Sequence, residues 1–370
     1  MPGHDEFERE GSLSRRRFVA ALAAVSTGLA GGRVPAARRE SPEGVEASPA
    51  GGRIDVHHHI VPPFYVEAMN RAGYGNIGGV PFPRWGKADL DRSFDVLGIR
   101  KAILSVSSPG VAVEDTGLER ELARRVNEYC ADLVRAYGPR AGAFASIPVS
   151  SAKAAIEETG FALDRLGLNG VCLFSSNSGT YLGDPRLDEY MEYLDSRNGI
   201  VFLHPTLPLE RMWPDVSIDP PLVEFVFETT RAVANMLYNG IFERFPNIRF
   251  IVAHLGGTIP FVSWRLGLFE HSAREAFRDF RRRCPRPVSE YLASLYYEVA
   301  VSCSPGNLRN VLSFVPAEHV LFGTDYPFAA QSFIDLNSAT LDEPGLLDAT
   351  VLQKISHENA ERLFGFEPGG

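Results

Sequence analysis

Three consecutive histidines close a short apolar run, residues 52–60. Successive side chains of a β-strand point to opposite faces, so in a strand His57 and His59 share one face while His58 lies on the other. Asp55 would lie on the same inward face as His57, where it packs or hydrogen-bonds a ligand. Two imidazoles on one face can bind a single metal ion. His57 and His59 are therefore the first candidate metal ligands.

Three later apolar runs carry a side chain of the same chemical kind at their ends. IVFLHP contains His204, FIVAHLGG contains His254, and VLFGTD ends at Asp325. The carboxyl ends of the strands of a parallel barrel meet on one face, so these side chains should converge. A catalytic zinc site commonly has three His or carboxylate ligands and an open position. We predict a Zn²⁺ site formed by His57, His59, His204 and Asp325.

His254 needs a separate role, because a fifth ligand would crowd the ion. We assign it to acid/base catalysis beside the ion, together with Asp325. Gly256 and Gly257 permit either a close turn beside the substrate or a simple turn from strand to helix. A two-metal site usually needs a bridging anionic ligand from the fourth strand, but residues 173–176 (LFSS) include no lysine or acid. We predict one ion per subunit.

The elements that must position these residues alternate along the chain. Each of eight apolar runs is followed by a helical stretch, which favours a parallel sheet and matches the (β/α)8 TIM barrel. An open doubly wound sheet is the alternative. Residues 61–86 are rich in Pro, Gly and aromatics, and we expect an irregular loop that overhangs the site. The predicted strands are 52–60, 101–108, 141–148, 169–175, 200–205, 247–257, 295–301 and 319–325. A long helix is predicted over 116–137, with Gly138 and Pro139 as its stop signal.

The first fifty residues have a different composition. Three arginines, Arg15, Arg16 and Arg17, precede Phe18, a small apolar run over 20–30 and a tail rich in Pro, Ala, Ser and Glu. This order is typical of a twin-arginine export signal. The apolar run is too short for a membrane span. We predict a signal and linker over 1–50, a barrel over 51–370 and an extracytoplasmic protein; a cytoplasmic tail is the alternative.

Charge and cysteine content exclude other classes of protein. The net charge of −9 argues against broad nucleic-acid binding, which needs clustered lysine and arginine. The four cysteines are far apart and form no C-x-x-C pair, so we expect neither a disulfide framework nor a zinc knuckle. Cys172 lies in an apolar run and should be a small buried hydrophobe.

The motifs IDVHHH, FLHP, AHLGGTIPF and LFGTDYPF resemble the amidohydrolase superfamily. They are most similar to the branch of 2-amino-3-carboxymuconate-6-semialdehyde decarboxylase and the salicylate-type decarboxylases. The resemblance runs from Arg53 to Phe366 and includes ETTRAVANMLYNGIFERFPNIRF. It implies a barrel that holds zinc or manganese, with His254 as the catalytic histidine. The implied ligands are His57, His59, His204 and Asp325.

Two further residues are candidates for substrate binding. Arg265 matches an arginine that, in the muconate enzyme, reaches the substrate of a neighbouring subunit, which implies a homodimer; a plain surface arginine is the alternative. The loop VPFPRW resembles that of 6-methylsalicylate decarboxylase rather than that of the muconate enzyme. Trp85 in this loop could stack on an aromatic ring or serve as a packing anchor.

These observations predict a metal-dependent decarboxylase that acts on a small hydroxylated aromatic or enoic carboxylic acid without an organic cofactor. The main alternative is a hydrolase of a lactone, ester or amide, because a bound metal can lower the pKa of water to about 7. A third reading is a metal-binding barrel without catalytic activity. The complete ligand set and the additional His254 argue against this third reading.

Overall fold

The structure is a computed structural model that describes residues 52–77, 79–208 and 217–368. The predicted export signal and linker, residues 1–50, lie outside the described residues. Within the described ranges, no helix is both long and apolar enough to cross a membrane.

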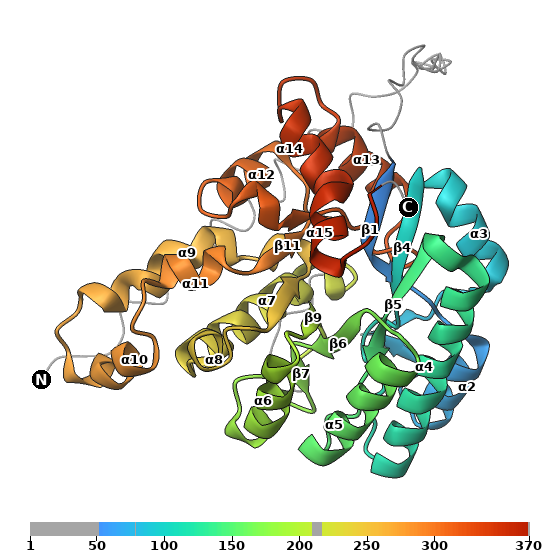
Figure 1. Ribbon diagram of the computed structural model, residues 1–370, viewed down its shortest axis with the longest axis horizontal. Helices are drawn as coiled ribbons and strands as arrows, with labels where there is room; N and C mark the ends of the chain where they lie inside the picture. Colours follow the sequence, from blue (N-terminus) through green and yellow to red (C-terminus); the bar gives the residue numbers. More distant parts are fainter. Residues whose placement is uncertain (1–51, 78, 209–216, 369–370) are drawn as a thin grey trace, which may run out of the picture. The chain divides into compact units, whose positions relative to one another are not determined.

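Eight strands of the described chain form one parallel sheet whose spatial order follows the chain (Figure 1). Backbone hydrogen bonds also join the two ends of this sheet. The Val56 amide donates to the Phe322 carbonyl at 3.0 Å, and the Asp325 amide donates to the His57 carbonyl at 2.8 Å. The sheet therefore closes on itself as a barrel and is not an open doubly wound sheet. The strands are β1 Arg53–His59, β4 Ile99–Ser105, β5 Ala141–Ser146, β6 Gly170–Phe174, β9 Ile200–His204, β10 Arg249–Val252, β11 Tyr296–Glu298 and β12 Val320–Leu321.

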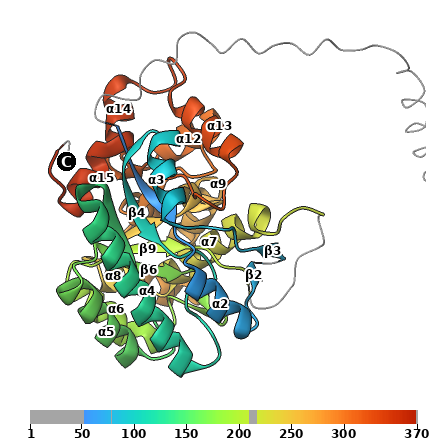
Figure 2. The ribbon, with the colours of Figure 1, turned by 90° about the vertical axis from the view of Figure 1, so that its right-hand side faces the viewer.

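Helices cover the outside of the barrel (Figures 1 and 2). The long helix α4, Thr116–Tyr137, has the predicted bounds. The Asp115 side chain caps its amino end by accepting hydrogen bonds from the amides of Gly117 and Leu118. The other α-helices are α2 Pro63–Arg71, α3 Lys87–Val96, α5 Ala152–Gly160, α6 Asp188–Ser196, α7 Pro221–Tyr238, α8 Ile241–Arg244, α9 Ile259–Gly267, α10 Arg278–Arg283, α11 Val288–Ala293, α12 Pro305–Leu312, α13 Gln331–Leu341, α14 Ala349–Gln353 and α15 Asn359–Phe364.

The prediction of an irregular loop over 61–86 is wrong in its first part, where α2 forms. Pro63 occupies the first helical position, where its missing amide hydrogen costs nothing. Tyr65 and Met69, four residues apart, are the buried face of the helix. Beyond α2 the chain forms a two-stranded hairpin, β2 Asn76–Ile77 and β3 Val80–Pro81.

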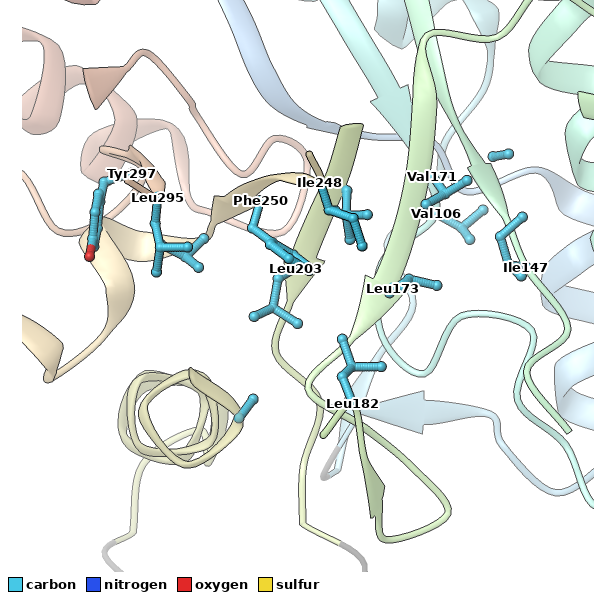
Figure 3. Close-up of a cluster of buried hydrophobic side chains, with 14 of the residues drawn as sticks. Val106, Ile147, Val171, Leu173, Leu182, Leu203, Ile248, Phe250, Leu295 and Tyr297 are labelled. Carbon is cyan, nitrogen blue, oxygen red and sulfur yellow. The ribbon is translucent and has the colours of Figure 1, made fainter. Parts of the chain in front are cut away.

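Two layers of apolar side chains fill the molecule. Inside the barrel, Phe144 stacks on Phe202 at a centroid distance of 5.3 Å, and the buried Cys172 belongs to the same cluster, as predicted. Between the strands and the helices lies a larger cluster, part of which Figure 3 shows, including Leu173 and Leu203. Leu203 and Phe202 thus face opposite sides of β9, so His204 shares the inner face with Phe202.

Strand β1 contains an irregularity that changes which residues face inward. Asp55 pairs with Ala102 and His58 pairs with Leu104, so β1 has one residue more than β4 in this interval. A β-bulge of this kind reverses the alternation of side chains. The prediction that Asp55 shares the inward face with His57 is therefore wrong. Asp55 instead lies on the side of His58, whose Nδ1 donates to its Oδ2 at 2.8 Å.

Candidate metal centre

The four side chains predicted to bind a metal converge at the carboxyl ends of the strands. His57 Nε2 lies 2.9 Å from His59 Nε2, and these nitrogens lie 3.4 and 3.2 Å from Asp325 Oδ1. With His204, the four candidate ligand atoms all lie within 4.8 Å of one another. Ligand atoms bound about 2.0–2.2 Å from one ion stand roughly 3–3.5 Å apart, so this spacing fits a single cation.

The three imidazoles are oriented by hydrogen bonds at their other ring nitrogen. Nδ1 of His57 contacts Glu298 Oε1 at 2.8 Å, Nδ1 of His59 contacts Ser105 Oγ at 3.1 Å, and Nδ1 of His204 contacts the Pro205 carbonyl at 2.6 Å. This pattern leaves the three Nε2 lone pairs directed at one point, as metal-binding histidines require. His204 Nε2 is buried and has no hydrogen-bond partner among the described residues. A cation at this point would satisfy that orphaned atom.

The electrostatics of the centre favour a positive charge. Burial lowers the pKa of His57, but the carboxylates of Glu298 and Asp325 outweigh burial and raise it to about 10. Burial likewise raises the pKa of Asp325, but His57 and His59 outweigh it and hold that pKa well below its usual range. Burial lowers the pKa of His59 to about 4. The buried carboxylate of Glu298 and the partly buried carboxylate of Asp325 thus hold a positive charge on His57, and a divalent cation bound to these side chains would supply positive charge in place of that proton.

Sequence reasoning missed Glu298, a buried carboxylate that connects the metal ligands to His254. Its Oε1 accepts hydrogen bonds from His57 Nδ1 at 2.8 Å and from the His254 amide at 2.6 Å. Its Oε2 accepts from the Ala300 amide at 2.6 Å. The available signal was an acidic residue inside the apolar run LYYEVAV, which a barrel interior tolerates only with partners.

Gly323 leaves the space that Glu298 occupies. A Cβ atom at Gly323 would lie 2.2 Å from Glu298 Oε2 and 2.9 Å from the Cβ of His57. Such a close approach is possible only for a residue without a side chain. The glycine of the motif GTDYPF therefore serves the packing of the site.

His254 lies beside the four candidate ligands, as predicted for an acid/base residue. Its φ is +56°, a left-handed conformation in which Nδ1 donates to the Ala300 carbonyl at 3.0 Å. Its Nε2 is 4.0 Å from Asp325 Oδ2. The glycines after it serve the turn, because a Cβ at Gly257 would lie 2.1 Å from the Val226 carbonyl oxygen of α7.

Asp55 orients the segment that carries Asp325. Its carboxylate accepts hydrogen bonds from the Thr324 amide at 3.0 Å and from the Thr324 hydroxyl at 2.6 Å. It also accepts from the His57 amide at 3.0 Å. Asp55 therefore connects both ends of the closed sheet, and through the His57 amide it hydrogen-bonds a candidate ligand residue, which is one of the two roles predicted for it.

Glu298, His57 and His254 also lie close enough together to suggest a second metal site. Each oxygen of Glu298 already accepts a hydrogen bond from a backbone amide, and His254 Nδ1 already contacts the Ala300 carbonyl. These contacts describe a hydrogen-bonded support for one ion rather than a second ligand set. No metal cluster without His57 is found in the described part of the chain.

A cavity of about 280 Å³ opens over the candidate metal centre. His254 and Asp325 line it where it meets the candidate ligands, Ser107, Asp219 and Ser302 are its other polar lining residues, and most of its walls are aliphatic or aromatic. Among the described residues that line it, there is no lysine or arginine. In this described lining, a cation held at the candidate metal centre would be a positive partner for an anionic group of a bound molecule. The lining is Ile77, Val80, Ser107, Asp219, Pro221, Leu222, Phe225, Val226, His254, Val301, Ser302, Asp325, Phe328, Ala329 and Phe333.

The two residues predicted to bind substrate do not line this cavity. Trp85 is only 7 % exposed and belongs to the apolar layer between strands and helices. This position matches the packing alternative rather than stacking on a substrate. Arg265 lies on α9 and is exposed to solvent. The predicted overhanging loop does reach the cavity, but through Ile77 and Val80 of the β2–β3 hairpin.

A closed (β/α)8 barrel with three histidines and an aspartate at its carboxyl end defines a class of metal-dependent barrel enzymes. The particular family follows from comparison with known proteins. Residues 54–366 match the model of the Amidohydro_2 family, described as amidohydrolase, and the chain belongs to this family.

The chain is similar to several curated fungal proteins. It is 31 % identical to the decarboxylase yanB of Aspergillus niger, over 84 % of this chain and 87 % of that protein. It is 32 % identical to the 6-methylsalicylic acid decarboxylase of Penicillium expansum, over 76 % of this chain and 87 % of that protein.

Solved structures share the fold. The crystal structure of an amidohydrolase II is 30 % identical with a TM-score of 0.78, covering 85 % of this chain and 99 % of that one. A dihydroxybenzoic acid decarboxylase from Polaromonas, solved with manganese and 2-nitroresorcinol, has a TM-score of 0.73 at 22 % identity, covering 85 % of this chain and 97 % of that one.

Proposed function

We propose that this protein is a metal-dependent carboxy-lyase that removes the carboxylate from a small hydroxylated aromatic acid resembling 6-methylsalicylate. The observation that carries the proposal is the cavity itself. It has an apolar ring-sized space with His254, Asp325 and the candidate metal centre at one end. The named activities of the curated relatives support the same reaction.

The reaction needs a fixed ring and a proton at the right carbon. A bound divalent ion would polarise the carboxylate and the neighbouring hydroxyl of the acid. His57, His59, His204 and Asp325 would hold that ion, while the aromatic walls of the cavity exclude water from the ring. When the bond between ring carbon and carboxylate breaks, its electron pair stays on the ring carbon. That carbon takes a proton from His254, whose Nε2 faces Asp325 Oδ2, and CO2 leaves.

The experiment compares decarboxylation with hydrolysis in the same protein. Purified protein loaded with Mn²⁺ or Zn²⁺ is incubated with 6-methylsalicylate and, separately, with aromatic lactones and esters. We expect CO2 release from the acid; acid release from lactones or esters without CO2 from any aromatic acid would favour the hydrolase. Replacing His254 by Ala should lower turnover by about 10²–10⁴-fold while the metal content stays unchanged. A His254→Ala protein with full turnover would refute its assigned role.

We infer one divalent ion per subunit, with Zn²⁺ as the first expectation and Mn²⁺ as the alternative. Manganese is the ion bound in the dihydroxybenzoic acid decarboxylase of similar fold. A ligand set of imidazole nitrogens and one carboxylate suits both metals. Metal analysis of protein purified without added metal, followed by activity of the reconstituted zinc and manganese forms, distinguishes them.

We also propose that the protein is a homodimer joined through α9. Phe261 and Trp264 on this helix are 81 % and 75 % exposed, and Leu268 directly after it is 45 % exposed. A cluster of exposed apolar side chains is typical of an interface. Arg265 is on the same helix, as an arginine that serves a neighbouring subunit would be. Light scattering of the wild type and of a Phe261→Ser/Trp264→Ser variant tests this: we expect a dimer and a monomer, respectively.

Finally, we propose an extracytoplasmic location through the twin-arginine export machinery. The support is the order of Arg15, Arg16 and Phe18 before the apolar run in the sequence. This proposal does not depend on the reaction assigned above.

A further inference from the structure

Val301, in the turn after β11, is the third residue with left-handed backbone around the cavity. Its φ is +54°, beside +56° for His254 and +62° for Asp325. A β-branched residue is rare in this conformation because its Cβ substituents crowd the backbone. The polar side chains of His254 and Asp325 explain why those two residues are kept there. Val301 has no polar side-chain atom, so its strain needs another reason.

The turn alone does not account for a valine. The neighbouring Ala300 makes the contacts that matter for the centre: its carbonyl accepts from His254 Nδ1, and its amide donates to Glu298. A glycine after Ala300 would allow the same backbone course without the Cβ penalty. What valine adds at this position is its side chain.

That side chain faces the cavity. Val301 lines it and is 38 % exposed, although it lies between the buried Ala300 and the partly buried Ser302. Phe328 and Phe333 line the same cavity, and His254 and Asp325 mark its reacting end. An aromatic acid with its carboxylate at that end would bring the substituents of its ring against these apolar walls.

We propose that Val301 is a specificity-determining residue that contacts an apolar substituent on the ring of the substrate. The inference rests on the proposed decarboxylase function and adds a preference among the aromatic acids that such an enzyme could decarboxylate. A methyl group on the ring should be favoured over a hydroxyl group at the same position, because a hydroxyl against the valine methyls would lose its hydrogen bonds to water.

The test uses two acids that differ in one group. 6-Methylsalicylate and 2,6-dihydroxybenzoate differ only by a methyl and a hydroxyl on the same ring carbon. The wild type should have the higher kcat/KM for 6-methylsalicylate. Val301→Thr keeps the shape of the side chain but replaces one methyl by a hydroxyl. We expect the ratio of the two kcat/KM values to fall by about tenfold, since one methyl contact in an apolar pocket is worth roughly 10–200-fold.

Val301→Gly separates substrate contact from a structural role. We expect a similar fall of the ratio, with a melting temperature that is equal or higher because the left-handed strain is relieved. A purely structural valine would instead lower the melting temperature and both kcat/KM values together. Asn198→Gly is the matched control: Asn198 has φ +50° but lies outside the cavity lining, so this variant should keep the wild-type ratio.

The outcomes are distinguishable. An unchanged ratio in both Val301 variants overturns the inference and leaves the decarboxylase function standing, as does a wild type that prefers the dihydroxy acid. If the metal-loaded wild type decarboxylates neither acid nor salicylate, the proposed function fails and this inference fails with it. If Val301→Gly does not fold, the Val301→Thr ratio alone supports or overturns the proposal.

Discussion

Replacing Glu298 by Gln tests whether the hydrogen bonds that Glu298 accepts hold the candidate metal ligands in place. Glu298 accepts three hydrogen bonds, two at Oε1 from His57 Nδ1 and the His254 amide and one at Oε2 from the Ala300 amide. A glutamine amide has only one oxygen. If the glutamine oxygen faces His57, it can accept from His57 Nδ1 and the His254 amide, but the glutamine NH2 group then faces the Ala300 amide, which loses its acceptor. If the glutamine amide is flipped, its oxygen accepts from the Ala300 amide, and His57 Nδ1 and the His254 amide lose their acceptor.

The magnitude follows from this count. One unpaired buried donor costs about 1–3 kcal/mol, so Glu298→Gln should lower the free energy of unfolding of the metal-free protein by that amount. Loss of a partner of a metal-bound histidine typically reduces metal affinity by about 10–100-fold. We expect metal affinity to fall by about tenfold in Glu298→Gln, because glutamine can keep a neutral hydrogen bond to His57. In Glu298→Ala, which keeps no hydrogen bond to His57, the fall in metal affinity should be close to about 100-fold.

Metal affinity is measured directly, by titrating metal-free protein with Mn²⁺ and following free Mn²⁺ by electron paramagnetic resonance. Glu158→Gln is the control, because Glu158 is buried and hydrogen-bonded to Asn127 and Arg124 away from the centre. It should lose stability but not Mn²⁺ affinity. Wild-type Mn²⁺ affinity in Glu298→Ala would refute the reasoning, whatever its stability.

Three further predictions concern the packing of the site, its ion and the leader. Gly323→Ala would place a Cβ 2.2 Å from Glu298 Oε2, so we expect about 1–3 kcal/mol of destabilisation by thermal unfolding and weaker Mn²⁺ binding; full affinity would show that Glu298 can move aside at no cost. Removing the ion with a chelator should lower the melting temperature, because an ion at 100 times its Kd stabilises the native state by about 2.7 kcal/mol; an unchanged melting curve after proven metal loss would contradict this. An Arg15→Lys/Arg16→Lys double variant should stay in the cytoplasm while the wild type is found outside it by cell fractionation, and equal distributions would exclude twin-arginine export.

The barrel was predictable because its strands and helices are strongly patterned. The run Thr116–Tyr137 carries a capping aspartate, an apolar stripe and a final Gly-Pro, and α4 has the predicted bounds. The irregular loop predicted over 61–86 is wrong at α2, because Pro is common in loops but Pro63 occupies the first helical position, which favours a helix start. The composition of this segment is compatible with both a loop and a helix, and the burial of Tyr65 and Met69 on one face favours the helix.

The centre was predictable where strand ends carry metal-type side chains, and less so where backbone geometry decides. His57, His59, His204 and Asp325 converge as their positions indicate. The prediction that Asp55 lies on the inward face of β1 is wrong because one extra residue in β1 reverses the side-chain alternation. No residue type in the sequence indicates such a bulge. The sequence does not indicate the role of Glu298 because two of its three partners, the His57 imidazole and the His254 amide, are 241 and 44 positions away in the chain.

The closure of the barrel has a consequence for biosynthesis. The ribosome releases the histidines of β1 long before Asp325 and Thr324, and Asp55 and Thr324 are 269 positions apart in the chain. The candidate ligands thus lie on both sides of the join between the first and last strands of the barrel, and they come together only after residue 325 has left the ribosome. An ion would therefore bind only once the barrel has closed, so the metal available in the compartment where the barrel closes would decide which ion the site acquires.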